Sequence, residues 1–119
     1  WYGLHTVYAS PNTVDIYNPK VIQSSMGSCF RVRLIPIAIS ELSQSISFSS
    51  IVATTLDGVF MEQYLPMNNS LVIIGNESQG ISSSTMKYAT DCITIPNRGR
   101  GESLNASIAT AIILNQYIK

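Results

Sequence analysis

Short segments rich in β-forming residues alternate with segments of helical character, and this order restricts the possible folds more than any other feature of the chain. The segments expected to form strands are residues 5–9, 30–35, 51–56, 71–74 and 92–96. Those expected to form helices are residues 19–26, 39–46, 82–88 and 108–119, with Asn18 as the cap of the first and Ser82 as the cap of the third. Asp57 and Gly58, after the third strand, indicate a turn. Such alternation is typical of an α/β layered fold. We therefore expect a mainly parallel sheet with helices on both faces.

Polar or glycine-containing segments follow three of the expected strands, at the ends where parallel sheets bind ligands. These segments are residues 54–55, 75–77 and 96–100. The last of them continues into a loop with Gly99 and Gly101, which allow backbone turns that other residues resist. Ser103 and Asn105 then open the final helix. A strand, a glycine loop and a polar helix start together suit a small ligand held by backbone groups.

The length of 119 residues suits one domain, residues 1–119. Because the chain begins at Trp1 without a methionine, we expect it to be an N-terminally truncated piece of a longer protein. Charged residues make up only 12% of the chain, about half the usual fraction. Scarce charge indicates a surface covered by another subunit or by further sequence. The alternative is a monomer whose apolar surface is exposed and prone to association. The net charge of zero gives no overall basic signature, although a local basic patch would suffice to bind RNA.

Membrane and metal functions have no support in the residues. No apolar run approaches the length of a membrane span, and no signal-peptide pattern opens the chain. Cys29 and Cys92 are widely spaced, without a CxxC pair or a histidine cluster near them. We therefore expect a cytoplasmic protein with two thiols, no metal and no membrane partner.

Single residues in these loops allow more than one interpretation. Glu77 is either a solvated carboxylate, a partner for a helix terminus or a functional group, and Ser103 is either a helix N-cap or a site residue. A nucleophilic role for Ser103 is not expected, because His5 is the only histidine and no GxSxG pattern is present. Alternation in residues 30–35 puts Arg31 and Arg33 on one side of a strand, which is either a solvated face or an RNA-facing patch.

Two of these segments resemble family motifs when they are read together. LVIIGNESQGI, residues 71–81, followed by ITIPNRGRGESLNASIATAI, residues 93–112, resembles the second and third motifs of the SpoU-type (TrmH-like) RNA ribose 2′-O-methyltransferases of the SPOUT superfamily. Residues 18–22 and 25–27 are similar to the helix between the first and second motifs. The resemblance covers practically the whole chain. It implies a C-terminal trefoil knot, a homodimer, S-adenosylmethionine as cofactor, and tRNA or rRNA as substrate.

The resemblance also implies a set of site residues. The catalytic residues would be Glu77, Ser103 and Asn105. The cofactor would be bound, largely through backbone groups, by Thr55, Leu56, Gly75, Asn76, Ile95, Ser103 and Leu104. The cations expected to contact RNA phosphates are Lys20, Arg31, Arg33, Arg98 and Arg100. No metal is implied.

The chain departs from the family pattern at several positions. The first motif, with an asparagine and the arginine thought to activate the ribose hydroxyl, would lie upstream of Trp1, so this chain alone is expected to be inactive without it. Asn97 stands where methionine or histidine is common, Gln23 where arginine is frequent, and Ala106 where valine is frequent. The alternative function is a non-catalytic knotted RNA-binding or scaffold subunit. A Rossmann-like nucleotide-binding domain is a third class, but its glycine fingerprint is missing.

Overall fold

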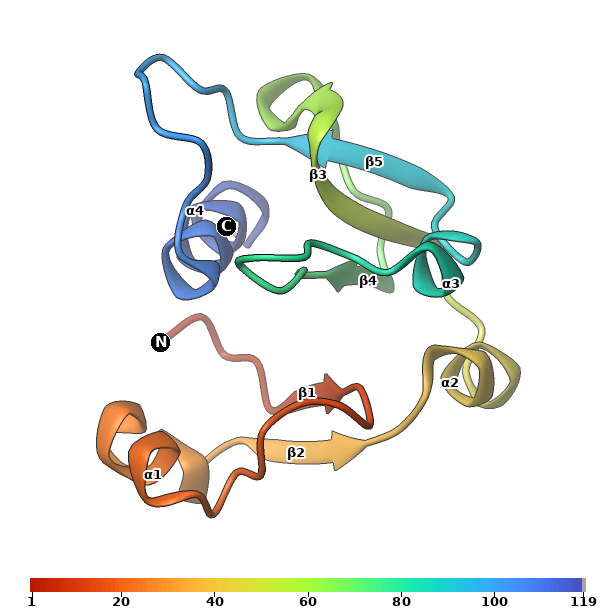
Figure 1. Ribbon diagram of the computed structural model, residues 1–119. Coiled ribbons are helices and arrows are strands. Elements are labelled where there is room, and N and C mark those ends of the chain that lie inside the picture. Colours follow the sequence, from red (N-terminus) through yellow and green to blue (C-terminus); the bar gives the residue numbers. More distant parts are fainter. Residues whose placement is uncertain (119) are drawn as a thin grey trace. The chain divides into compact units, whose positions relative to one another are not determined.

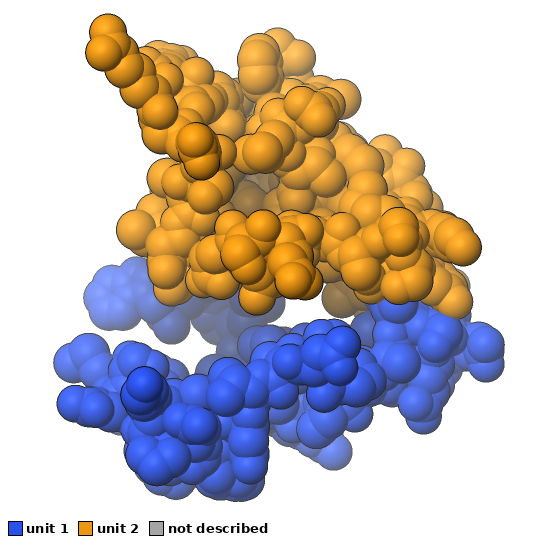
Figure 2. Space-filling model, viewed as in Figure 1, with its two compact units in different colours: residues 1–45 blue, residues 46–119 orange. Residues whose placement is uncertain are grey.

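A computed structural model describes residues 1–118 of the chain. These residues form two compact units, one of residues 1–45 and one that begins at Ile46 (Figure 2). Each unit contains parallel strands and helices, which confirms the expected α/β class. In the described part of the chain, no helix is both long enough and apolar enough to cross a membrane.

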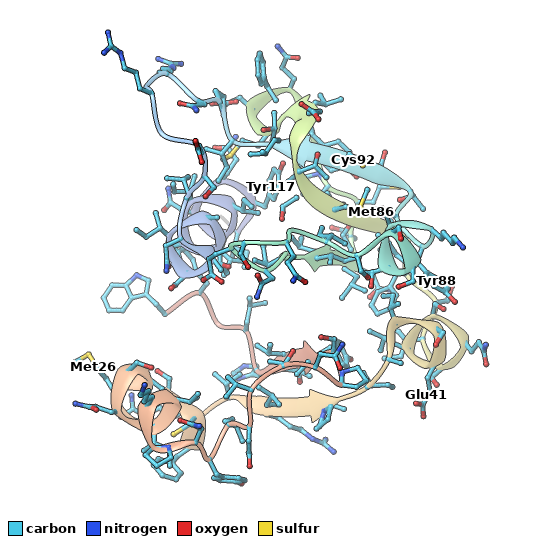
Figure 3. The ribbon with its side chains drawn as sticks, in the orientation of Figure 1. Met26, Glu41, Met86, Tyr88, Cys92 and Tyr117 are labelled. Atoms are coloured by element: carbon cyan, nitrogen blue, oxygen red, sulfur yellow. The ribbon has the colours of Figure 1, made fainter. Side chains whose placement is uncertain are left out.

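The first unit is built on one pair of parallel strands. Its elements are β1 (Thr6–Ala9), α1 (Pro19–Ser25), the 3-10 helix η1 (Ser28–Phe30), β2 (Arg33–Pro36) and α2 (Ile39–Ser45). β1 and β2 pair in parallel, with Thr6 opposite Arg33 and Ala9 opposite Pro36. As predicted, Asn18 caps α1, since its Oδ1 accepts a hydrogen bond of 3.0 Å from the Lys20 N–H. Met26 follows this helix in the left-handed conformation, with φ 49°, and Figure 3 shows it at the end of α1.

The strand expected at residues 30–35 is shorter than the alternation predicted. Backbone hydrogen bonds from Phe30 to Gly27 and from Arg31 to Ser28 wind this segment into η1 instead. Strand pairing begins only at Arg33, whose N–H donates to the His5 carbonyl at 2.8 Å. The prediction that Arg31 and Arg33 share one strand face is therefore wrong. Local turn hydrogen bonds after the left-handed Gly27 override the alternating pattern there.

The second unit contains a three-stranded parallel sheet in the order β4-β3-β5 (Figure 1). Its elements are β3 (Ser50–Phe60), the 3-10 helix η2 (Met61–Gln63), β4 (Ser70–Ile73), α3 (Ser83–Met86), β5 (Asp91–Thr94) and α4 (Ala106–Tyr117). β3 is central, and Val52 and Ala53 in it are fully buried. Ser82 caps α3 through the Thr85 N–H, as the sequence predicted.

The core of the second unit joins the sheet to the final helix. Val52, Met61, Ile93 and Ile113 form one buried cluster, against which Tyr64 and Tyr117 pack. The Tyr117 hydroxyl also donates to the Met61 carbonyl at 3.2 Å, and Figure 3 shows this side chain on α4. Burial raises the pKa of Tyr117, and the neighbouring Tyr64 and Glu62 raise it further. One side of α4 is thus core, while Ile108 on the same helix is 53% exposed.

β3 changes its register against β5 midway along its length. Thr54 and Val59 are both opposite Ile93, so residues 55–58 have no partner in β5. Thr94 holds this bulge, because its Oγ1 donates to the Leu56 carbonyl at 3.2 Å. The sequence predicted a strand end at Leu56 and a turn at Asp57 and Gly58. The chain instead resumes strand pairing and continues to Phe60.

Candidate functional site

The loop after β4 is a rigid turn fixed by its own backbone and by one side chain. Asn76 and Gly80 exchange two backbone hydrogen bonds, of 3.0 and 2.8 Å. Asn76 Oδ1 accepts from the N–H and hydroxyl of Ser78, at 2.9 and 2.8 Å. A β-carbon on Gly75 would lie 2.7 Å from the Gly80 carbonyl carbon, so only glycine fits there. Because its side-chain oxygen and its backbone N–H are used inside the loop, the groups that Asn76 can offer a ligand are its side-chain Nδ2 and the second lone pair of its carbonyl.

Glu77, on the same loop, meets the start of α4. Its Oε1 accepts a hydrogen bond of 3.4 Å from the Ala106 N–H, one of the free donors at the N-terminus of that helix. The positive end of a helix favours a carboxylate at this position. Of the interpretations open for Glu77, the structure therefore shows a partner for a helix terminus. It also places Glu77 beside Asn105, so two of the predicted catalytic residues lie together.

Asn105, and not Ser103, caps α4. Asn105 Oδ1 accepts from the N–H of Ser107 at 2.9 Å and from its hydroxyl at 2.6 Å. The interpretation of Ser103 as the helix cap is therefore wrong, because the helix begins at Ala106. Ser103 and Leu104 lie exposed in the segment that leads into the helix. Figure 1 shows that segment running from the end of β5 to α4.

The bulge of β3 carries a buried polar atom without a partner. Thr55 Oγ1 is buried, and no described residue forms a hydrogen bond with it. A buried hydroxyl in this state costs about 1–3 kcal/mol unless an ordered water, an ion or another bound group satisfies it. The neighbouring Leu56 is 75% exposed, although it is large and apolar. An apolar surface next to an unsatisfied hydroxyl fits a ligand with both apolar and polar parts.

The loop after β5 is held by Asn97. Its Nδ2 donates to the Gly101 carbonyl at 2.6 Å, and its Oδ1 accepts from the Gly99 N–H at 2.9 Å. Arg98 and Arg100 are exposed on this loop, whereas Ile95 before it is half-buried. The other predicted RNA-binding cations, Lys20, Arg31 and Arg33, are exposed on the first unit.

Three loops of the second unit thus form one connected framework. Thr94, at the end of β5, is bonded to the bulge of β3, and Glu77 bonds the loop after β4 to the start of α4. Each loop offers backbone groups, and together they supply one carboxylate and one unsatisfied hydroxyl. Within the described residues, no group of three histidine, cysteine or acidic side chains is placed to hold a metal. The framework suits an organic ligand held by backbone and hydroxyl groups.

Sequence reasoning missed two residues that build this framework. Gly58 lies so close to β5 that a β-carbon there would be 2.5 Å from the Ile93 carbonyl carbon. Thr94 fixes the bulge from the opposite strand. The sequence signal for Gly58 was read only as a turn, and Thr94 resembles any other β-branched strand residue.

The arrangement defines an α/β protein with polar and glycine-containing loops at one end of a parallel sheet. The family described as the SpoU rRNA Methylase family matches residues 1–115, and the chain belongs to that family. The chain spans about half the length of the curated relatives that it matches along most of its length.

Named relatives and a solved structure agree with this membership. The chain is 29% identical over 117 residues to the 23S rRNA (guanosine(2553)-2′-O)-methyltransferase RlmP of Bacillus subtilis, covering 94% of this chain and 46% of that protein. It is 44% identical over 45 residues to the tRNA (guanosine(18)-2′-O)-methyltransferase of Aquifex aeolicus, covering 38% of this chain and 21% of that protein. The AdoMet-bound rRNA methyltransferase from Sinorhizobium meliloti is similar in structure, with a TM-score of 0.87 and 26% identity over 97% of this chain and 46% of that one.

Replacing Asn105 by alanine is expected to lower the free energy of unfolding by about 1 kcal/mol, because α4 loses its cap. Asn105→Asp keeps the acceptor oxygen for the Ser107 N–H and should retain most of that stability. Urea denaturation of both variants beside the unchanged chain measures the difference. Equal losses in the two variants would mean that the cap is not what Asn105 contributes.

Proposed function

We propose that the protein containing this chain transfers a methyl group from S-adenosylmethionine to a ribose 2′-hydroxyl of tRNA or rRNA. The observation that carries the proposal is the connected framework of three loops in the second unit. Its bonds join the bulge of β3 to the end of β5, and the loop after β4 to the start of α4. Family membership and the 2′-O-methyltransferase relatives support the same reaction.

The residues of the framework fit the cofactor. Thr55 Oγ1 needs a hydrogen-bond partner, and the exposed side chains of Leu56 and Leu104 offer apolar surface. Backbone groups of Gly75, Asn76 and Ile95 and the hydroxyl of Ser103 complete the proposed cofactor-binding set. When bound, S-adenosylmethionine supplies an electrophilic methyl group on a positively charged sulfur.

The chain's own residues would position the reactants. Methyl transfer requires the ribose oxygen in line with the methyl group and an acceptor for the hydroxyl proton. Glu77 fixes the loop after β4 against the α4 N-terminus, and Asn105 fixes the first turn of that helix. Together with Ser103 they would hold the reacting groups in place. Arg98, Arg100 and the cations of the first unit would bind phosphates.

We further propose the architecture and assembly that the family resemblance implies. These are a mainly parallel sheet with helices on both faces, a C-terminal trefoil knot and a cytoplasmic homodimer. The exposure of Ile108 and Ile112 on α4, at 53% and 36%, supports a partner on this helix.

Calorimetric titration of S-adenosylhomocysteine into this chain, with the solution mass measured alongside, tests the proposed cofactor site. We expect binding of one molecule per chain, weakened in Thr55→Val. A well-folded chain that binds none would show that these loops do not form the cofactor site. The result would favour the alternative function, that of a non-catalytic RNA-binding subunit. A monomeric mass would contradict the homodimer without affecting the cofactor result.

Arg100→Ala in the full-length protein is expected to weaken RNA binding about equally for all sequences. The slope of log affinity against log salt should fall by about 1, because one phosphate contact is lost. Lys87→Ala, which removes an exposed cation at the end of α3, is the matched control. An unchanged salt slope in Arg100→Ala would remove this residue from the RNA-binding set.

A further inference from the structure

The second unit contains a groove that none of the proposed cofactor residues lines. Its volume is about 470 Å³, and it is lined by Phe60, Glu62, Gln63, Pro96, Asn97 and Arg98. The groove is largely open to solvent, so a ligand there would be covered on one side only. It has room for one small molecule or for one unit of a polymer.

One wall of the groove is the end of β3 with η2, and it is firmly anchored. Phe60 pairs with Thr94 of β5. Met61, the next residue, is 5% exposed and belongs to the core cluster. Its carbonyl also accepts the hydrogen bond from the Tyr117 hydroxyl. Glu62 and Gln63 are therefore exposed side chains on a fixed backbone.

The facing wall is the start of the loop after β5. The two hydrogen bonds of Asn97, to Gly99 and Gly101, fix the loop without help from other segments. Arg98 follows on the same turn and is exposed. Asn97 occupies a position where the family commonly has methionine or histidine. The amide that shapes this wall thus distinguishes this chain from the common family pattern.

The lining chemistry matches one nucleotide. The Phe60 side chain is half exposed, at 50%, and offers an aromatic surface on which a base can stack. The Glu62 carboxylate only accepts hydrogen bonds, whereas the Gln63 amide both donates and accepts, so the two can bind the polar edge of a base. The Arg98 guanidinium is a phosphate-binding group. Aromatic surface, base-edge groups and a phosphate cation therefore line one groove.

We propose that this groove binds an unpaired nucleotide of the substrate RNA, a proposal that rests on the function proposed above. The base stacks on Phe60 and its phosphate contacts Arg98. The two carboxylate oxygens of Glu62 match the adjacent N1–H and amino donors of guanine, whereas the edge of uracil has one N–H between two carbonyls, so the groove favours guanine over uracil. None of the proposed cofactor residues lines the groove, but its facing wall is the loop after β5 that follows Ile95, so the groove adds RNA contacts beside the proposed cofactor site.

The test is an NMR titration of the isotope-labelled chain with 5′-GMP and 5′-UMP, with and without saturating S-adenosylhomocysteine. We expect shifts of the Glu62, Gln63 and Arg98 amides that persist when S-adenosylhomocysteine is present, with 5′-GMP binding more tightly than 5′-UMP. Phe60→Leu should weaken both nucleotides about tenfold, because stacking is lost while apolar bulk is kept. Glu62→Gln should remove the preference for 5′-GMP. Phe30→Leu, which changes an exposed aromatic side chain of the first unit, should have no effect.

Each contrary result has a defined meaning. Shifts confined to the loops around Thr55 and Gly75, and abolished by S-adenosylhomocysteine, would show nucleotides in the cofactor loops and overturn the groove proposal. Absence of shifts at the groove would overturn it as well. If Phe60→Leu perturbs folding, the nucleotide affinity of Gln63→Ala is measured instead. This substitution is at an exposed position and removes the amide proposed to bind the polar edge of the base. The groove amides report nucleotide binding whether or not the chain binds S-adenosylhomocysteine, so the two proposals fail separately.

Discussion

Gly58→Ala is expected to lower the free energy of unfolding by about 3 kcal/mol or more, the largest effect of any exchange considered. A β-carbon at this position would lie 2.5–2.6 Å from the carbonyl carbon, Cα and nitrogen of Ile93. These are backbone atoms of a strand residue that is 1% exposed, so the neighbour cannot move aside. The bulge at residues 55–58 must then shift, and we expect affinity for S-adenosylhomocysteine to fall with the stability.

Gly101→Ala is the matched control for this prediction. No atom lies within 4 Å of a β-carbon built there, so the same change should alter stability by no more than about 0.5 kcal/mol. Urea denaturation followed by circular dichroism, together with calorimetry, measures both effects. A Gly58→Ala variant as stable as Gly101→Ala would show that the bulge does not depend on the close contact with β5.

Thr55→Val is expected to change stability and cofactor affinity in opposite directions. The exchange keeps the branched shape and removes a buried hydroxyl that has no partner among the described residues. Without ligand, the free energy of unfolding should rise by about 1 kcal/mol, because an unsatisfied polar group is removed. If the hydroxyl bonds to the cofactor, the affinity for S-adenosylhomocysteine should fall about tenfold or more.

Thr55→Ser supplies the complementary control. It keeps the hydroxyl and removes a methyl group, so it should lose some stability and retain cofactor affinity. Thermal unfolding with and without S-adenosylhomocysteine measures both the stability of each variant and its affinity for this ligand. Unchanged affinity in Thr55→Val would mean that the cofactor does not use this hydroxyl, even though the loops bind it.

Several elements could be predicted from local sequence because their causes are local. Asn18 followed by Pro19 predicted the start of α1, and Ser82 predicted the start of α3, since a cap bonds to a backbone group two or three residues away. The apolar segment before Gly75 predicted β4, and the alternation of strands and helices predicted parallel pairing. The exception was the segment at Phe30 and Arg31, where short-range turn bonds overrode the alternating pattern.

The motif residues were also found from sequence, but their contacts were not. Glu77 and Asn105 came from the resemblance to family motifs, and their assigned roles stay predictions. Sequence could not show that Glu77 bonds to the Ala106 N–H, because the partners are 29 positions apart. The sequence offered Ser103 as a possible cap of α4, but the hydrogen bonds from Ser107 to Asn105 Oδ1 show that Asn105 is the cap.

The sequence by itself determined the class of fold, the starts of α1 and α3 and the family of this protein, because those depend on local bonding and on motif order. Only the tertiary structure decided where β3 bulges, why residue 58 is glycine and which hydroxyl is left unsatisfied. It also decided that Phe60 and Arg98, far apart along the chain, line one groove. These features arise from the approach of backbone segments about 35 residues apart, as Gly58 and Ile93 are. A local sequence pattern cannot predict a contact between segments so far apart in the chain.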